Sequence, residues 1–148
     1  MDSTTVAMGT AGAMGTAETD QLSVSFVAGE SYLVSVRGHQ LLVDQPFDSG
    51  GDDMAPSPVE VFVASLAACV AFYAGRYLTR HGESRNGLRV SAGFDMATGR
   101  PARVGAIWIL VSAPELPAEA RAAFQAVVSH CTVHNTLIRP PDISIKIA

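Results

Sequence analysis

Cysteine is scarce in this chain, with only two among 148 residues, too few for the disulfide framework of a small secreted protein. The segment ahead of residue 21 also lacks the basic and apolar regions of a secretory signal. Both absences favour a reducing compartment, and we expect a cytoplasmic protein. Two cysteines in such a compartment are more often redox-active or buried than joined permanently.

Charge is also sparse. The chain carries 10 Lys and Arg residues against 14 Asp and Glu, a net charge of −4, and has no basic cluster. Nucleic acid and a membrane surface are therefore not expected as partners. The longest apolar run, residues 59–75, is interrupted by Glu60 and Ser65. Because it is short and rich in alanine, it does not predict a membrane span.

The chain has room for one domain with a hydrophobic core. Residues 1–20 are mostly small and polar without periodicity, which predicts a disordered tail ahead of a single domain at 21–148. From residue 21 onward the segments LSVSFV, YLVSV and QLLVD alternate between apolar and polar positions. This alternation predicts three short antiparallel strands.

One apolar helix is predicted from Ser57 to Gly82, with Cys69 near its middle. Ser57 and Glu60 have the spacing of a capping box, and Pro58 occupies the first helical position, where its missing N–H costs nothing. Apolar residues then recur at spacings of three and four, which places the thiol on the same stripe. The stripe consists of Val59, Phe62, Val63, Leu66, Cys69, Val70, Tyr73 and Tyr77. Because hardly any polar face is present, we expect this helix to be central and covered on most sides.

Two more strands are predicted at residues 88–97 and 102–113, joined by a turn at 98–101. A second helix is predicted from residue 118 to about 130, with a further helical turn at 133–138. Residues 143–147 alternate as a terminal strand. The resulting order βββ-α-ββ-α-β keeps the helices apart from a largely antiparallel sheet and predicts an α+β fold.

The two cysteines are the first candidates for chemistry. A free cysteine on an apolar stripe is usually inert packing, since free cysteine is among the most buried residue types. Cys131, however, also lies on the core side of its helix, and both helices share one core, so the two thiols can approach each other. A disulfide requires Cα atoms within about 7 Å, and both interpretations, packing and redox pair, stay open at this point.

A reactive thiol must be ionised, and nothing near Cys69 along the sequence ionises it. Cys69 lies about 18 Å from the helix N-terminus at ~1.5 Å per residue, beyond the reach of the helix dipole. A cation must therefore come from elsewhere. Arg37, expected on the second strand, is the best candidate, and Arg76 on the same helix face as Cys69 is the second.

Two other groups have competing interpretations. Glu60 is explained by the capping box, and a catalytic carboxylate is the alternative. His130 and His134 flank Cys131 and suggest a metal-dependent hydrolase, but the clustered spacing of strong zinc motifs is absent. We therefore expect no metal site.

Three segments together resemble the OsmC/Ohr family of thiol-dependent peroxidases, most closely its OsmC-like branch. They are GHQLLVDQP from Gly38, GGDDMAPSPVEVFVASLAAC ending at Cys69, and the later HCTVHNTL. The resemblance covers about residues 21–148.

The resemblance implies a domain-swapped homodimer in which antiparallel sheets wrap around two central helices, with active sites at the subunit interface. Cys69 would attack an organic hydroperoxide and become a sulfenic acid, and Cys131 would resolve it as a disulfide. An external dithiol, typically a lipoyl group on a protein, would reduce that disulfide, with no metal, haem or flavin. Phe62, Leu66 and Tyr73 would line the substrate site.

The chain departs from the family's peroxidases at one position. Those enzymes carry a glutamate directly after the helix-start proline, where it pairs with an arginine that activates the thiolate. Here that position is Val59, and Glu60 matches the Pro-x-Glu pattern of the OsmC-like branch, with Arg37 as the counterpart of the arginine. The alternative is a non-catalytic dimer of the same fold that senses redox state or binds a small molecule.

Overall fold

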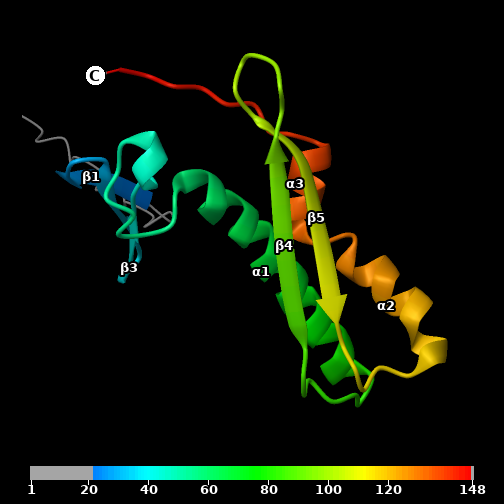
Figure 1. Cartoon of the computed structure of the whole chain (residues 1–148). Helices are drawn as coiled ribbons and strands as arrows, with labels where there is room; N and C mark the ends of the chain where they lie inside the picture. The colour runs from blue at the N-terminus through cyan, green and yellow to red at the C-terminus, as the bar shows by residue number, and fades with distance from the viewer. Residues whose placement is uncertain (1–21, 148) are drawn as a thin grey trace, which may run out of the picture.

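The computed structural model describes residues 22–147 (Figure 1). Within that range the chain forms a three-stranded sheet, a long helix, a two-stranded hairpin and two short helices. The α+β class and the predicted order of the first five strands and the long helix are confirmed. The predicted disordered tail at residues 1–20 lies outside the described residues.

Strands β1 (Leu22–Ala28), β2 (Ser31–Val36) and β3 (His39–Val43) form an antiparallel meander. The pairing brings most of the apolar residues of the three strands to one face, since side chains alternate across a strand, while Leu33 and Leu42 pair on the other face. The apolar face carries Leu22, Val24, Phe26, Tyr32, Val34, Val36, Leu41 and Val43. Every residue of β1 is nevertheless exposed, Phe26 by 65%. The apolar face of this sheet is therefore largely uncovered in the single chain.

Helix α1 (Pro58–Arg80) begins at the predicted capping box. The Glu60 carboxylate accepts from the Ser57 backbone N–H at 2.7 Å and from the Ser57 hydroxyl at 2.9 Å, while the Ser57 hydroxyl oxygen accepts from the Glu60 N–H. Gly82, at φ 71°, gives the left-handed exit that a side chain would strain. Both ends of the helix are thus set by local residues.

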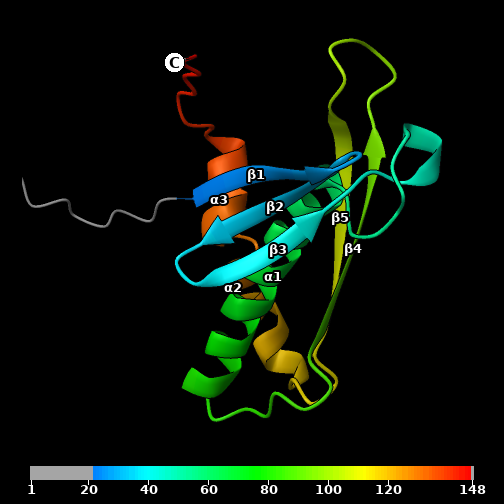
Figure 2. The same cartoon turned by 90° about the vertical axis from the view of Figure 1, so that its left-hand side faces the viewer.

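The hairpin of β4 (Arg89–Met96) and β5 (Val104–Ser112) packs on α1, and α2 (Arg121–Val128) packs on another side of the same helix. Their shared interior is the main core. Its buried members are Leu66, Val70, Ala74, Tyr77, Leu78, Leu116, Phe124, Val128 and Cys131. We call α1, β4, β5, α2 and α3 the body. Figure 1 shows the β1–β3 sheet set apart from the β4–β5 hairpin, and Figure 2 shows the three strands of that sheet side by side.

The predicted second helix is divided in the structure. A 3₁₀ turn at Ala118–Ala120 leads into α2, which ends at Val128, and α3 (Thr132–Ile138) begins separately. The break occurs because Cys131 has extended backbone angles, φ −68° and ψ 157°, and occupies the N-cap position of α3. The predicted extra helical turn at 133–138 is therefore a helix of its own.

Two expectations are wrong for the single chain. Residues 143–147 form no strand, and their three isoleucines are 82 to 98% exposed, since they pair with none of the strands β1 to β5. Helix α1 is also not covered on most sides: Ala64, Ala68 and Phe72, spaced by four, form an exposed stripe.

By length and composition alone α1 also qualifies as a membrane span, with a mean hydropathy of 1.7 over an 18-residue window that is 28% buried. The core helix of a soluble protein passes the same test. Because its buried side packs on β4, β5 and α2, α1 is interpreted as a core helix.

Candidate active site

The two cysteines meet between α1 and the start of α3. Cys131 is fully buried, whereas Cys69 is partly exposed and packs against the cluster that contains Cys131. Burial raises the pKa of the Cys131 thiol, and the neighbouring Cys69 raises it further. The predicted approach of the two thiols is therefore present in the structure, and both are free.

The N-terminus of α3 acts in the opposite direction on Cys131. The backbone N–H groups of His134 and Val133 lower the pKa of Cys131, as expected for a thiol at a helix N-terminus, although its sulfur accepts no capping hydrogen bond. The sequence reveals the N-cap position of Cys131 only indirectly, because cysteine is not among the usual N-cap residues. A helical turn starting directly after Cys131 is the one signal for it.

A hydrogen bond joins the two helices beside the thiols. The hydroxyls of Tyr73 and Thr132 are 2.9 Å apart, Tyr73 lying one helical turn after Cys69 and Thr132 directly after Cys131. Sequence reasoning assigned Tyr73 to a substrate pocket and missed Thr132. Only the fold reveals the pair, since 59 residues separate them in the chain.

Arg37 is not near Cys69 in the single chain. It lies beyond the end of β2, in the two-residue turn to β3, with φ 53°, so its expected place on the second strand is wrong. The register pairs Val36 with His39 and leaves Arg37 and Gly38 as the turn. Within the described residues, strands β1–β3 have at most marginal contact with other elements, so the fold of the single chain does not bring Arg37 beside Cys69.

The other proposed charged groups have contacts of their own. The Arg76 guanidinium lies over the Phe72 ring, 5.4 Å from its centroid. The backbone and hydroxyl of Ser57 both lower the pKa of Glu60, so capping accounts for the bonds that this carboxylate makes. Among residues 22–147 no side-chain hydrogen bond joins an arginine to Cys69.

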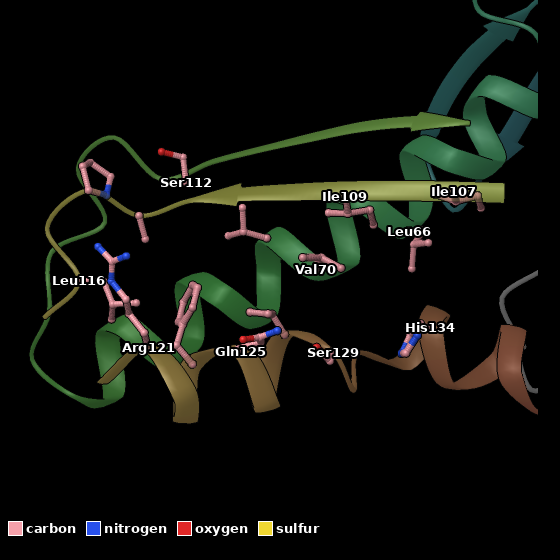
Figure 3. Close-up of a pocket in the computed structure, with 15 residues that line it drawn as sticks. Leu66, Val70, Ile107, Ile109, Ser112, Leu116, Arg121, Gln125, Ser129 and His134 are labelled. Carbon is pink, nitrogen blue, oxygen red and sulfur yellow. The ribbon is translucent and has the colours of Figure 1, made fainter. Parts of the chain in front are cut away.

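A cavity of about 720 Å³ lies between β5 and α2, over α1 (Figure 3). Apolar residues line its middle, with Arg121 at one end and His134 at the other. Phe62 and Leu66 line a second hollow of about 510 Å³, and Leu66 also borders the first. Neither hollow is lined by Cys69, Cys131 or Tyr73. The expected single pocket of Phe62, Leu66 and Tyr73 around the thiol is thus not formed by one chain.

The histidines beside Cys131 do not gather around a common point. The His130 ring Nδ1 lies 2.7 Å from the Ala126 carbonyl oxygen, and His134 borders the cavity. In the part of the chain that the structure describes, no three His, Cys, Asp or Glu side chains are placed to share a metal ion.

Comparison with known proteins agrees with this arrangement. The family model described as OsmC-like protein matches residues 50–146, which include α1, both cysteines and α3. The chain belongs to the OsmC-like family. Together with the packing of α1 in the core, this membership indicates a soluble protein. No curated protein matches the chain significantly by sequence.

Solved structures of this family share the fold. A Psychrobacter arcticus protein described as an osmotic stress induced and detoxification response protein superposes with a TM-score of 0.72 at 21% identity, over 78% of this chain and 85% of that one. The OsmC like protein of Mycoplasma pneumoniae gives 0.67 at 17% identity, over 82% and 89%. An organic hydroperoxide resistance protein of Legionella pneumophila gives 0.61 at 18% identity, over 80% and 88%.

Proposed function

We propose that this protein is a cysteine peroxidase that reduces organic hydroperoxides to alcohols in the cytoplasm. The observation that carries the proposal is the pairing of a partly exposed Cys69 with a sealed Cys131 in one apolar interior. The exposed thiol is open to an oxidant, while the buried one is protected from it and adjacent to the product. The hydroperoxide resistance described for the Legionella pneumophila relative supports the same class of activity.

The cycle has three balanced steps. The Cys69 thiolate attacks the outer oxygen of the hydroperoxide, so an S–O bond forms, the O–O bond breaks, and the alkoxide leaves as the alcohol after taking a proton. The Cys131 thiolate then attacks the sulfur of the Cys69 sulfenic acid; the S–S bond forms and hydroxide leaves as water. An external dithiol, such as a dihydrolipoyl group, reduces the disulfide and is itself oxidised. No metal or organic cofactor takes part.

In this proposal, the active form of the protein is a homodimer in which the two chains exchange their β1–β3 sheets. Three apolar surfaces support it, because each is uncovered in the single chain: the β1–β3 face, the Ala64–Ala68–Phe72 stripe of α1, and the isoleucines of residues 143–147. Large uncovered apolar faces are typical of protein interfaces. A second copy covers all three if the sheet of each chain packs on the body of the other.

The dimer also supplies the missing cation and pocket wall. Arg37, held at the exposed β2–β3 turn, would reach Cys69 of the other chain and favour its thiolate. The other chain would likewise complete a substrate pocket beside Phe62, Leu66 and Tyr73. Glu60, next to the same helix start, would orient the arginine with its remaining acceptor capacity.

Peroxide turnover tests this proposal. Purified protein is mixed with cumene hydroperoxide and dithiothreitol or dihydrolipoamide, and peroxide loss is followed. Cys69→Ser is expected to fall to the uncatalysed rate, since it removes the nucleophile. Cys131→Ser still reacts with one equivalent of peroxide but does not form the intramolecular disulfide. Ser65→Ala, one turn before Cys69 on the same helix, is the matched control and keeps full activity.

A redox-sensing or small-molecule binding protein is the competing function. The cavity of about 720 Å³, which neither cysteine lines, favours it because such volumes are typical of ligand sites. It predicts no peroxide turnover with either reductant and ligand binding that survives Cys69→Ser. That result would replace the peroxidase with this second function.

A further inference from the structure

Helix α3 carries the resolving thiol at its N-cap but is weakly held to the rest of the chain. None of its residues is buried. The other α3 side-chain bonds, those of Asn135 and Thr136, return to backbone oxygens at His130 and Thr132. Within the described residues, the Tyr73–Thr132 hydrogen bond is the one side-chain hydrogen bond that ties α3 to α1. Elements with few buried contacts open at low free-energy cost.

The position of this bond relates it directly to the thiols. Tyr73 follows Cys69 by four residues, so the two side chains share one face of α1. Thr132 is covalently next to Cys131. The bond therefore lies beside both thiols, and it holds the Tyr73 and Thr132 hydroxyl oxygens 2.9 Å apart.

We propose that the Tyr73–Thr132 hydrogen bond is a clamp that positions Cys131 for attack on oxidised Cys69. The inference rests on the proposed peroxidase cycle and assigns these hydroxyls to its second step. Tyr73 and Thr132 are positioning residues, since neither exchanges atoms with the substrate. In the step they assist, the Cys131 thiolate forms the S–S bond, the S–O bond of the Cys69 sulfenic acid breaks, and hydroxide leaves.

Two conservative variants isolate the clamp. Tyr73→Phe keeps the aromatic ring and removes its hydroxyl. Thr132→Val keeps the shape of the side chain and removes the Thr132 hydroxyl. Each is expected to slow disulfide formation about three- to tenfold, the effect of losing one hydrogen bond. The double variant is expected to be no slower than either single one, because they remove the same interaction.

The readouts separate the clamp from a general structural effect. In Thr132→Val, which leaves the proposed substrate pocket untouched, the reaction of Cys69 with cumene hydroperoxide should stay within about twofold of wild type, while dimedone traps more sulfenic acid because the second step is slower. Ser65→Ala, which also deletes a hydroxyl from α1, should leave both steps unchanged. A Thr132→Val variant that slows both steps equally would overturn the clamp, as would a Thr132→Val variant that slows neither.

A measurement without peroxide keeps the clamp distinct from the peroxidase proposal. The fully folded protein is equilibrated in mixtures of reduced and oxidised glutathione, and the Cys69–Cys131 disulfide is quantified by alkylation and mass spectrometry. Two glutathione thiols form as the protein disulfide forms, so the electrons balance. The clamp predicts an equilibrium constant about three- to tenfold lower in both variants.

Each outcome of that measurement decides one proposal. A lower constant in the variants supports the clamp even if wild-type protein turns over no peroxide, which would refute only the peroxidase. Equal constants in wild type and variants would overturn the clamp and leave the peroxidase standing. A wild-type protein that forms no Cys69–Cys131 disulfide in glutathione would overturn the clamp as well.

Discussion

The β1–β3 sheet and the body are built from similar sequence patterns but differ in what covers them. In the body, Leu78 is 1% exposed and Ala74 and Cys131 are fully buried. In the sheet, the apolar face carries Phe26 at 65% exposure and Leu22 at 61%, and its strands contribute nothing to the main core cluster. An apolar face that its own chain leaves bare indicates a surface completed by another molecule.

The first way to test this contrast is to truncate one apolar side chain in each region. Leu78→Ala should lower the free energy of unfolding by about 2–5 kcal/mol at any protein concentration, because it leaves a cavity in the body. Phe26→Ala should cost no more than about 0.5 kcal/mol in dilute protein, where it is a surface residue, and clearly more at high concentration. Urea unfolding at two concentrations measures both. A Phe26→Ala effect independent of concentration would contradict an intermolecular cover.

A charge on the exposed stripe of α1 is expected to have the next largest effect. Ala68→Glu should weaken dimerisation at least about tenfold, because an unpaired carboxylate would be buried at the interface. The fold of the single chain is preserved, since Ala68 is exposed there. Sedimentation velocity measures the change, with Asn86→Glu in the exposed loop after α1 as the control. Equal dimerisation in both variants would remove this stripe from the interface.

The smallest effect concerns the segment that connects the two regions. Asp44, 1% exposed at the end of β3, accepts hydrogen bonds from the backbone N–H groups of Asp52 at 3.2 Å and Met54 at 3.1 Å. The Met54 N–H lowers the pKa of Asp44 most, assisted by the N–H groups of Gln45 and Asp52 and the Ser31 hydroxyl, while burial opposes them. The ionised carboxylate therefore stabilises the folded loop.

The sign of the pH dependence follows from that lowered pKa. The stabilisation is fully present above about pH 4, the usual value of an unfolded aspartate, and is lost as the pH falls through the lower folded value. Asp44→Asn should thus be less stable than wild type at pH 6, with the difference closing towards pH 3. Chemical denaturation at several pH values measures it, with exposed Asp48→Asn as the control. A difference unchanged between these pH values would exclude the carboxylate as its source.

Local features of the fold were predictable from the sequence, whereas features that depend on distant partners were not. The Ser57–Glu60 capping box and the Gly82 exit are set within a few residues, and both are as predicted. The strand at residues 143–147 depends on an edge that this chain does not offer it. The role of Cys131 as the N-cap of α3 was not predicted because cysteine is an unusual N-cap residue.

The residues of the candidate site also divide into those whose positions were predictable from the sequence and those whose positions were not. That Cys69 and Cys131 can approach follows from two helices sharing a core, and the fold brings them together. The expected position of Arg37 failed because the hairpin register, and not its residue type, placed it in the turn. Thr132 was missed because a hydroxyl gives no periodic signal and its partner is 59 residues away.

The complete burial of Cys131 has a consequence for the last step of the proposed cycle. A bulky dithiol cannot reach that sulfur, so it must attack the disulfide at Cys69 and form its mixed disulfide there. Cys131 then becomes the leaving group, and the backbone N–H groups of His134 and Val133, which lower its pKa, favour its departure as a thiolate. The N-terminus of α3 would thereby determine that Cys131 is the leaving sulfur and Cys69 the sulfur that the dithiol attacks.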